Sequence, residues 1–297
     1  MKHGLGDGAQ FTIVLRHIAH YFPHWNLDME VGSGKESYFQ GKLNKIFRRK
    51  IDDYDTRTYD EILDVLWPVP RICSEYLPST KPTEFLQKVL KVNPIEKLYV
   101  GYDITITDYE KKLADNFIKT LPNKPFVLVH YLAKTLKGSK SLTHPEARFI
   151  CKCIKNMGCT PVVLDWKKES PLPDNKTIFN PDAENPIWQG IKNSSAGTLA
   201  ALISRAKLYV GIDSGPLHVA GTTNTPSIGV WHGHHPINFF DLCNNVTHLV
   251  PTDYRIKGRE TQLAVKYFEN KYHHYYYNNL RETLAEVISE KLKGDHS

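Results

Sequence analysis

Asp7 stands in a glycine-rich segment, residues 4–10, that leads into a helix predicted at Thr12–Tyr21. Glycine lets the backbone turn sharply and come close to a ligand, and the start of a helix offers unpaired N–H groups to an anion. A carboxylate in that turn is well placed to act as a general base. It could equally cap the helix or the turn, and the spacing alone leaves both roles open.

A second segment of this kind, residues 211–218, follows a predicted strand. Asp213, Ser214 and Gly215 stand at the end of that strand, and the proline after them is typical of the first position of a helix. The amides near Ser214 and Gly215 would then face an anion such as a phosphate. Ser214 could instead cap the helix, and His218 could face a cleft or be a core histidine with its hydrogen bonds satisfied.

Lys134, Thr135, Lys137 and Lys140 lie in a loop with a glycine and a serine, after a strand predicted at Phe126–His130. Lysines at the carboxyl end of a strand suit a diphosphate, because they offset the charge that builds up on a leaving group. The alternative is an ordinary solvated loop.

Three histidines, His232, His234 and His235, occupy a span of four positions. A metal site is one interpretation, but no carboxylate or cysteine stands beside them at ligand spacing. The sequence therefore predicts no metal site, and favours a polar loop facing a nucleotide or sugar, with Gly233 and His234 as candidate cleft residues.

The elements that position these residues differ between the two halves. The N-terminal half is predicted to hold helices at Thr12–Tyr21 and Tyr109–Leu121, a strand at Trp25–Val31, and an irregular proline-rich stretch with a short helix at 68–94. The C-terminal half alternates strands (Phe126–His130, Thr160–Asp165, Leu208–Ile212, Ser227–Trp231) with helices (Pro145–Met157, Thr198–Ala206, one from Pro216, Glu282–Leu292). Such alternation predicts an α/β fold with a parallel, doubly wound sheet. We expect an N-terminal domain at 1–122, a C-terminal domain at 123–258, and a segment and helix at 259–297 that could cross back to the N-terminal domain.

Composition and charge limit the function. The 297 residues carry a formal net charge of +6, which fits an anionic ligand but falls short of a nucleic-acid-binding protein. A basic run at 42–50 is interpreted as a solvated helix face. The five cysteines have no framework spacing, which predicts free thiols in a reducing cytoplasm. We see no signal peptide, and no apolar stretch approaches the ~20 residues of a membrane span.

The motifs together resemble glycosyltransferase family 9, the ADP-heptose:lipopolysaccharide heptosyltransferases. The similarity is carried by residues 202–220, by Thr225-Pro226-Ser227, by Gly233-His234-His235-Pro236 and by Gly6-Asp7. It implies a GT-B fold, in which two Rossmann-like domains with parallel sheets face a central cleft. It also implies a metal-independent, inverting sugar transfer, with the donor nucleotide on the C-terminal domain and the acceptor on the N-terminal one.

The resemblance also assigns roles to residues. Asp7 would be the general base, near Gly6. Lys140 and the amides at Ser214, Gly215 and Leu217 would stabilise the departing diphosphate, with Thr135, Asp213 and His218 on the donor side. The family's Lys-x-Trp-Pro motif is not kept after Lys140, so Lys134 or Lys137 could hold that role.

The expected partners are a nucleotide-sugar donor such as ADP-heptose and a saccharide or other hydroxyl-bearing acceptor. No cofactor and no nucleic acid are expected, and membrane contact is at most peripheral. A GT-B sugar-nucleotide epimerase and a non-catalytic nucleotide-sugar-binding protein are the alternative functions.

Overall fold

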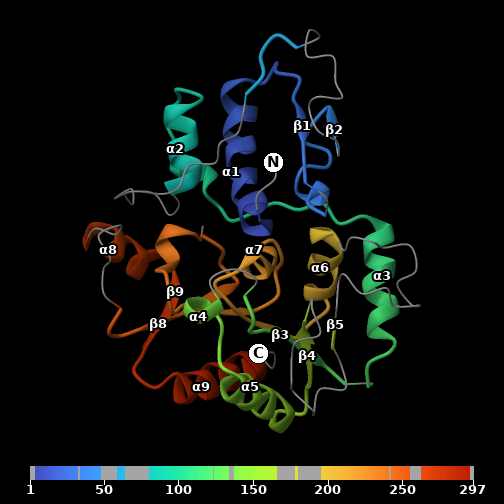
Figure 1. The fold of residues 1–297 in the computed structure, drawn as a ribbon, viewed down its shortest axis with the longest axis vertical. Helices are drawn as coiled ribbons and strands as arrows, with labels where there is room; N and C mark the ends of the chain where they lie inside the picture. Colours follow the sequence, from blue (N-terminus) through green and yellow to red (C-terminus); the bar gives the residue numbers. More distant parts are fainter. Residues whose placement is uncertain are drawn as a thin grey trace.

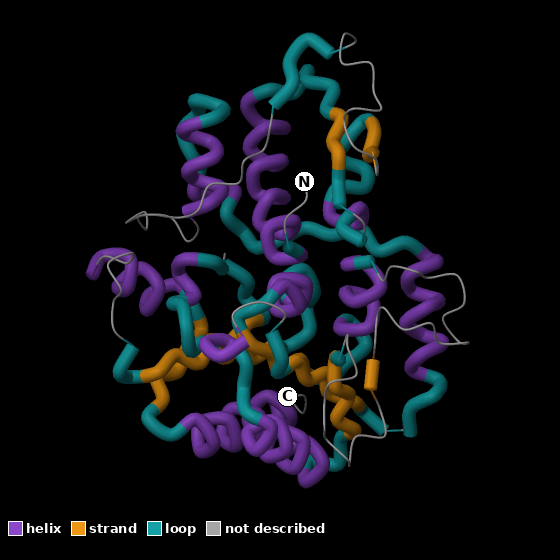
Figure 2. Tube along the Cα trace, viewed as in Figure 1, coloured by secondary structure: helices purple, strands orange, loops and turns teal. Residues whose placement is uncertain are grey.

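The computed structural model describes residues 4–32, 34–47, 59–63, 80–122, 124–133, 137–165, 178–179, 195–240, 242–254 and 262–294. Its C-terminal half is built on a seven-stranded sheet in which all paired strands run parallel (Figure 1; Figure 2). In their order across the sheet, the strands are β5 (Ile178–Phe179), β4 (Thr160–Leu164), β3 (Phe126–His130), β6 (Leu208–Ile212), β7 (Ser227–Val230), β8 (Val246–Pro251) and β9 (His273–Tyr277). The predicted α/β class with a parallel sheet is confirmed.

The order of the strands reverses between β3 and β6. The chain runs outward from β3 through β4 to β5, then returns to pair β6 with β3 and continues to β9 at the other edge. Such a switch point leaves a crevice at the carboxyl ends of the two central strands, where open α/β sheets bind their ligands. The segments that follow His130 and Ile212 are therefore brought to the same crevice.

Both faces of the sheet are buried, because alternate residues of a strand point to opposite sides. On β3, Val127 and Val129 pack into the same apolar cluster as α5 (His144–Asn156) and α9 (Leu280–Lys293). Leu128 faces the other way, into the cluster that holds α6 (Ala196–Ile203) and α7 (Gly215–Ala220). Figure 1 shows α5 and α9 on one side of the sheet and α6 and α7 on the other.

The N-terminal half is organised around α1 (Leu5–Tyr21), with α2 (Thr80–Lys88) beside it (Figure 1). A small parallel sheet of β1 (Asp28–Glu30) and β2 (Lys45–Phe47) lies on the opposite side of α1. The predicted helix at Thr12–Tyr21 is confirmed but begins at Leu5. Asp7 is therefore in the first turn of the helix, and the expectation of a turn before the helix is wrong.

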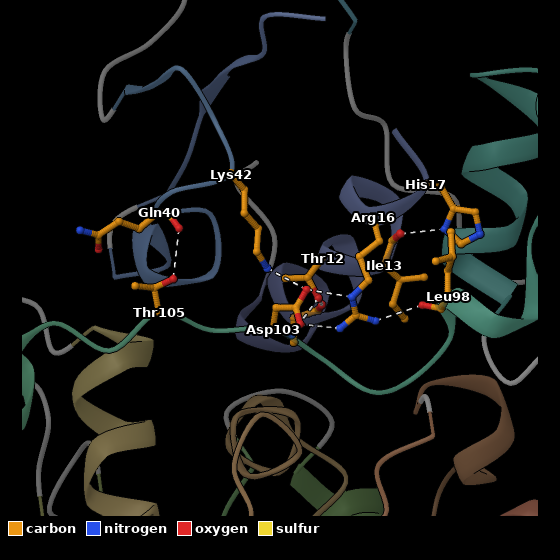
Figure 3. Close-up of polar contacts among 10 residues, drawn as sticks. Thr12, Ile13, Arg16, His17, Gln40, Lys42, Leu98, Asp103 and Thr105 are labelled. Carbon is orange, nitrogen blue, oxygen red and sulfur yellow. Dashed lines mark hydrogen bonds and ion pairs between the residues drawn. The ribbon is translucent and has the colours of Figure 1, made fainter. Parts of the chain in front are cut away.

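Polar contacts hold α1 against the loop that contains Asp103 (Figure 3). Arg16 donates to both carboxylate oxygens of Asp103, at 2.8 and 2.6 Å, and Lys42 Nζ lies 2.8 Å from the same carboxylate. Burial alone would raise the pKa of Asp103, but Arg16 and Lys42 outweigh it and hold that pKa below its ordinary value. Lys42 begins the basic run for which the sequence predicted a helix face. In the described part of that run, residues 42–47, no helix forms and Lys45–Phe47 is β2.

The two halves meet along α3 (Asp108–Ile118), which the sequence placed in the domain 1–122. α3 packs on α6, beside the C-terminal sheet (Figure 1). Its Glu110 accepts a hydrogen bond from Ser37 Oγ at 2.7 Å and another from Ser195 Oγ at the cap of α6. One buried carboxylate thus ties the N-terminal half to the C-terminal half.

The described part of the segment 259–297 extends the C-terminal half. It comprises α8 (Gln262–Lys271), β9 and α9; β9 pairs with β8, and α9 packs on α5. Its strand and its last helix therefore add to the C-terminal sheet and its outer helix layer. Among the described residues no helix is both long and apolar enough to cross a membrane. Cys151, Cys153, Cys159 and Cys243 are free thiols, and Cys73 lies outside the described residues.

Candidate functional site

Side chains from β3 and from the segment after β6 meet at the switch point. Ser214 Oγ lies 3.0 Å from His130 Nδ1. Burial lowers the pKa of His130 to about 4, so the imidazole is neutral near pH 7. Ser214 stands at the N-cap position of α7, but its side chain makes no capping hydrogen bond. The hydroxyl is engaged at the crevice, and the simple capping alternative is wrong.

Asp213 is a buried carboxylate at this edge of the sheet. His234 Nδ1 lies 2.7 Å from its Oδ2, and Lys140 Nζ lies 2.9 Å from the same oxygen. Burial would raise the pKa of Asp213, but the hydrogen bond from His234 and the charge of Lys140 outweigh it and keep that pKa below its ordinary value. Lys140 is the last residue of α4 (Lys137–Lys140). The predicted lysine loop and the histidine loop are thus joined through one carboxylate.

Asp7 reaches the site from the N-terminal half. Its Oδ2 accepts the N–H of Gly4 at 3.0 Å, which satisfies a backbone donor before the first turn of α1. Its Oδ1 forms an ion pair with Lys81 Nζ from α2. The side chains of Asp7 and Lys81 are 21% and 17% exposed, so the pair is only partly open to solvent. Asp7 is both a helix-start residue and a carboxylate at the border of the two halves.

The first turn of α1 packs directly on α7. A Cβ at Gly6 would lie 2.7 Å from His218 Cδ2, and a Cβ at Gly215 would lie 2.8 Å from Leu5 Cβ. Glycine is needed at both positions because the helices approach so closely. The amide of Gly215 was expected to face an anion, whereas the open side of its Cα faces Leu5.

His218 is a packed histidine between the two halves. Its Nδ1 lies 3.0 Å from the hydroxyl of Tyr102, and burial lowers its pKa to about 4. The charges of Asp213, Asp7, Lys81 and Lys140 all act on this ring. The core alternative for His218 therefore holds. The ring lies close to a group of charged side chains, called the charged cluster below, which comprises Asp7, Lys81, Lys140, Asp213 and His234.

Phe239 lies between the cations of the two halves. Lys81 Nζ is 5.8 Å from the centroid of its ring and Lys140 Nζ is 6.0 Å from it. The His234 ring centroid lies 4.7 Å away. The backbone carbonyl of Phe239 accepts a hydrogen bond from Gln10 of α1, which fixes this loop to the N-terminal half.

The structure brings together Asp7, Lys140, Asp213, Ser214, His218 and His234. Lys134 and Thr135 lie outside the described residues, and Lys137 begins α4. Gly233 packs against α4, since a Cβ there would lie 2.8 Å from the carbonyl oxygen of Ser139. The amide expected at Leu217 to bind phosphate instead donates to the carbonyl of Ser214 at 3.1 Å, so that assignment is corrected.

The three histidines of residues 232–235 each contact a different partner. His232 Nδ1 lies 3.0 Å from the Tyr277 hydroxyl, His234 binds Asp213, and His235 Nδ1 accepts the N–H of Ile237 at 3.3 Å. Within the described residues no group of three or more metal-binding side chains converges. His234 belongs to the charged cluster, whereas the other two rings make contacts within the C-terminal half.

Lys81 and Phe239 were missed by the sequence reasoning. Lys81 stands in the proline-rich stretch, where no motif singles it out. Phe239 follows the histidine loop, and its place beyond a strand end was the one signal that could have suggested a role.

The site combines the Asp7 carboxylate of the N-terminal half with Lys140 of the C-terminal half, whose positive charge is balanced by Asp213. An anionic group bound near Lys140 and the start of α7 would lie near Asp7. A proton acceptor beside an anion site is the arrangement that acid–base chemistry on a phosphorylated substrate requires.

Comparison with known proteins finds similar sequences for a part of the chain. Residues 194–267, which include β6, α7 and β7, match the model of glycosyltransferase family 9 (heptosyltransferase). A segment of 57 residues, 19% of this chain, is 39% identical to lipopolysaccharide heptosyltransferase 3 of Escherichia coli. The matched segment spans 17% of that relative's length.

Solved structures share the fold over nearly the whole chain. ADP-heptose lipopolysaccharide heptosyltransferase II of E. coli superposes with a TM-score of 0.66 at 11% identity, covering 100% of both chains. A family 9 glycosyltransferase of Veillonella parvula DSM 2008 gives a TM-score of 0.63 at 12% identity, covering 99% of this chain and 96% of that one. These structures confirm the GT-B architecture predicted from the sequence. The resemblance of the sequence motifs to glycosyltransferase family 9 is confirmed over residues 194–267.

Proposed function

We propose that this protein transfers a sugar, a heptose, from a nucleoside diphosphate donor such as ADP-heptose to an acceptor hydroxyl, with inversion at the anomeric carbon. The observation that carries the proposal is the meeting of Asp7 from α1 with Lys140, Asp213 and Ser214 at the switch point of the C-terminal sheet. The family 9 match over residues 194–267 supports it, as does the binding of ADP by a protein of similar fold, E. coli heptosyltransferase WaaC.

In the proposed reaction Asp7 accepts the proton of the acceptor hydroxyl. The oxygen attacks the anomeric carbon while the bond from that carbon to the diphosphate breaks on the opposite face, and the electron pair leaves with the diphosphate. A positioned base contributes about 10²–10⁴-fold.

The departing diphosphate is stabilised by Lys140 and by the amides of Ser214 and Gly215 at the start of α7. Asp213 holds Lys140 beside this position through the 2.9 Å contact. A well-aimed donor can supply about 3–4 kcal/mol of transition-state stabilisation. We propose that no metal and no cofactor take part, and that the protein acts in the cytoplasm.

The experiment is a thermal-shift screen with nucleotides and nucleotide sugars, followed by product analysis. A ligand at about 100 times its Kd stabilises the folded state by about 2.7 kcal/mol. We expect ADP and ADP-heptose to stabilise the protein, and we expect mass spectrometry to show a glycosylated core oligosaccharide and released ADP. The reaction should proceed equally in EDTA.

Two results would replace the proposal. An epimerase would return an isomeric nucleotide sugar with no release of ADP. A non-catalytic binding protein would be stabilised by the nucleotide sugar but would form no product. Lack of stabilisation by every nucleotide tested would remove the donor assignment itself.

A further inference from the structure

Lys81 belongs to the charged cluster, but neither the sequence motifs nor the proposed reaction uses it. It is the second residue of α2, in the N-terminal half. Its ammonium group is paired with Asp7 Oδ1, while Asp7 Oδ2 is occupied by the N–H of Gly4. Both oxygens of the proposed base are therefore engaged.

This pairing opposes the proposed role of Asp7. A cation held on a carboxylate stabilises its charged form and so weakens its attraction for a proton. A general base also needs a free lone pair within hydrogen-bond reach of the proton that it removes. Asp7 would be a better base if Lys81 moved away from it.

The other neighbours of Lys81 show where it could go. Its Nζ lies 5.8 Å from the centroid of the Phe239 ring, and Lys140 Nζ lies 6.0 Å from the same centroid. Lys140 is the lysine placed at the donor diphosphate under the proposed function. An anion bound by Lys140 next to this ring would lie within reach of the flexible side chain of Lys81.

A second cation remains beside Asp7. Lys35 is buried, which lowers its pKa, and the charge of Asp7 partly counteracts that effect. The carboxylate would therefore stay next to a positive charge after Lys81 had moved. Moving Lys81 away from Asp7 therefore costs less free energy than separating an ion pair that has no other cation beside it.

We propose that Lys81 is a positioning residue that exchanges partners: it holds Asp7 in the donor-free protein and moves to the diphosphate when the donor binds. The proposal rests on the proposed function. Its consequence is an ordered reaction, because Asp7 can accept a proton only after the donor has bound. No covalent bond changes in the exchange; one ion pair replaces another.

The test is a double-mutant cycle on ADP affinity, measured by isothermal titration calorimetry. The four proteins are the wild type, Asp7→Asn, Lys81→Met and the double variant. If Lys81 must leave Asp7 to reach the diphosphate, then Asp7→Asn releases it in advance. We expect Asp7→Asn to tighten ADP binding about three- to tenfold, the range that one partly buried ion pair supports.

The remaining variants distinguish an exchange of partners by Lys81 from simple repulsion of the bound anion by Asp7. Lys81→Met should weaken ADP binding about tenfold, and Asp7→Asn should then change the affinity by less than twofold in the Lys81→Met background. Lys88→Met, on the same helix with its side chain 67% exposed and paired only with Glu84 among the contacts seen, is the matched control and should bind ADP as the wild type does.

Three outcomes contradict the exchange. Equal tightening by Asp7→Asn in both backgrounds would mean that Asp7 merely repels the anion. An unchanged affinity for Asp7→Asn, or for Lys81→Met, would mean that Lys81 does not move to the diphosphate. If Lys81→Met does not fold, as judged by thermal denaturation, Lys81→Gln takes its place in the cycle. A wild type that fails to bind ADP would overturn the proposed function as well.

Discussion

Gly6→Ala probes the contact that brings Asp7 to the donor side of the molecule. The new Cβ would lie 2.7 Å from His218 Cδ2 and 3.0 Å from His218 Nε2. The ring cannot swing away easily, because its Nδ1 is bonded to the Tyr102 hydroxyl at 3.0 Å and its face packs on Phe240 with centroids 5.0 Å apart. Either α1 must shift away from α7 or the histidine must leave its site.

The expected cost follows from two opposing effects. Overpacking of a tight site costs about 1–3 kcal/mol, while alanine gains about 0.5–1 kcal/mol over glycine inside a helix. We therefore expect Gly6→Ala to lower the free energy of unfolding by about 1–2 kcal/mol. At roughly 2–4 °C per kcal/mol for a chain of this size class, the melting temperature should fall by several degrees.

The assay is thermal denaturation followed by circular dichroism, with Gly138→Ala as the control. Gly138 also lies in a helix, α4, but a Cβ there meets no atom within 4 Å. Gly138→Ala should be as stable as the wild type or slightly more stable. A Gly6→Ala protein that melts at or above the wild-type temperature would refute the close packing of α1 on α7.

Two further changes test the charges of the site. The buried His130 and His218 have pKa values near 4, below the ~6.5 of the unfolded chain. The unfolded state therefore binds more protons as the pH falls from about 6.5 to about 4, and stability should drop by up to about 1.4 kcal/mol per pH unit for each ring. Denaturant titrations at pH 7, 6 and 5 would show this, and a free energy of unfolding that stays constant would contradict the burial of both. Asp213→Asn removes the buried partner of Lys140 and His234, and should cost about 3 kcal/mol; wild-type stability would show that this pair is not formed.

The strands around the site could be predicted because their sequences are locally unambiguous. Continuous apolar runs such as Phe126–His130 and Leu208–Ile212 match buried parallel strands, and a proline after Gly215 marks a helix start. These local signals were enough to place Asp213 and Ser214 at the carboxyl edge of the sheet.

β8 and β9 were not predicted from the sequence, because both contain histidines that interrupt the apolar pattern of a buried strand. β8 carries the fully buried His248, whose Nδ1 accepts a hydrogen bond from Trp231 Nε1 at 2.9 Å. β9 is a run of histidines and tyrosines on an edge strand. Valine, threonine and tyrosine favour strands, so the histidines are the residues whose place in the sheet depends on tertiary contacts.

The start of α1 was misplaced for a related reason. Glycines at positions 4, 6 and 8 argue against a helix on propensity, yet Gly6 lies against His218, and a Cβ at Gly8 would lie 3.0 Å from Tyr38 Cδ2. These glycines serve the packing of the helix, which no local pattern reveals. The pairing of Lys81 with Asp7 joins residues separated by 74 positions and was equally beyond a sequence motif.

The most direct test of the account is the rate of sugar transfer by Asp7→Asn at saturating ADP-heptose, with a core oligosaccharide as acceptor. Asparagine keeps the size of the side chain and still caps a helix, but it cannot accept the proton. Asp108→Asn, with its side chain 98% exposed on α3, is the matched control and should transfer sugar at the wild-type rate. For Asp7→Asn the account predicts a rate about 10²–10⁴-fold below the wild type, in a protein that circular dichroism shows to be folded. Transfer by Asp7→Asn at the wild-type rate would contradict it.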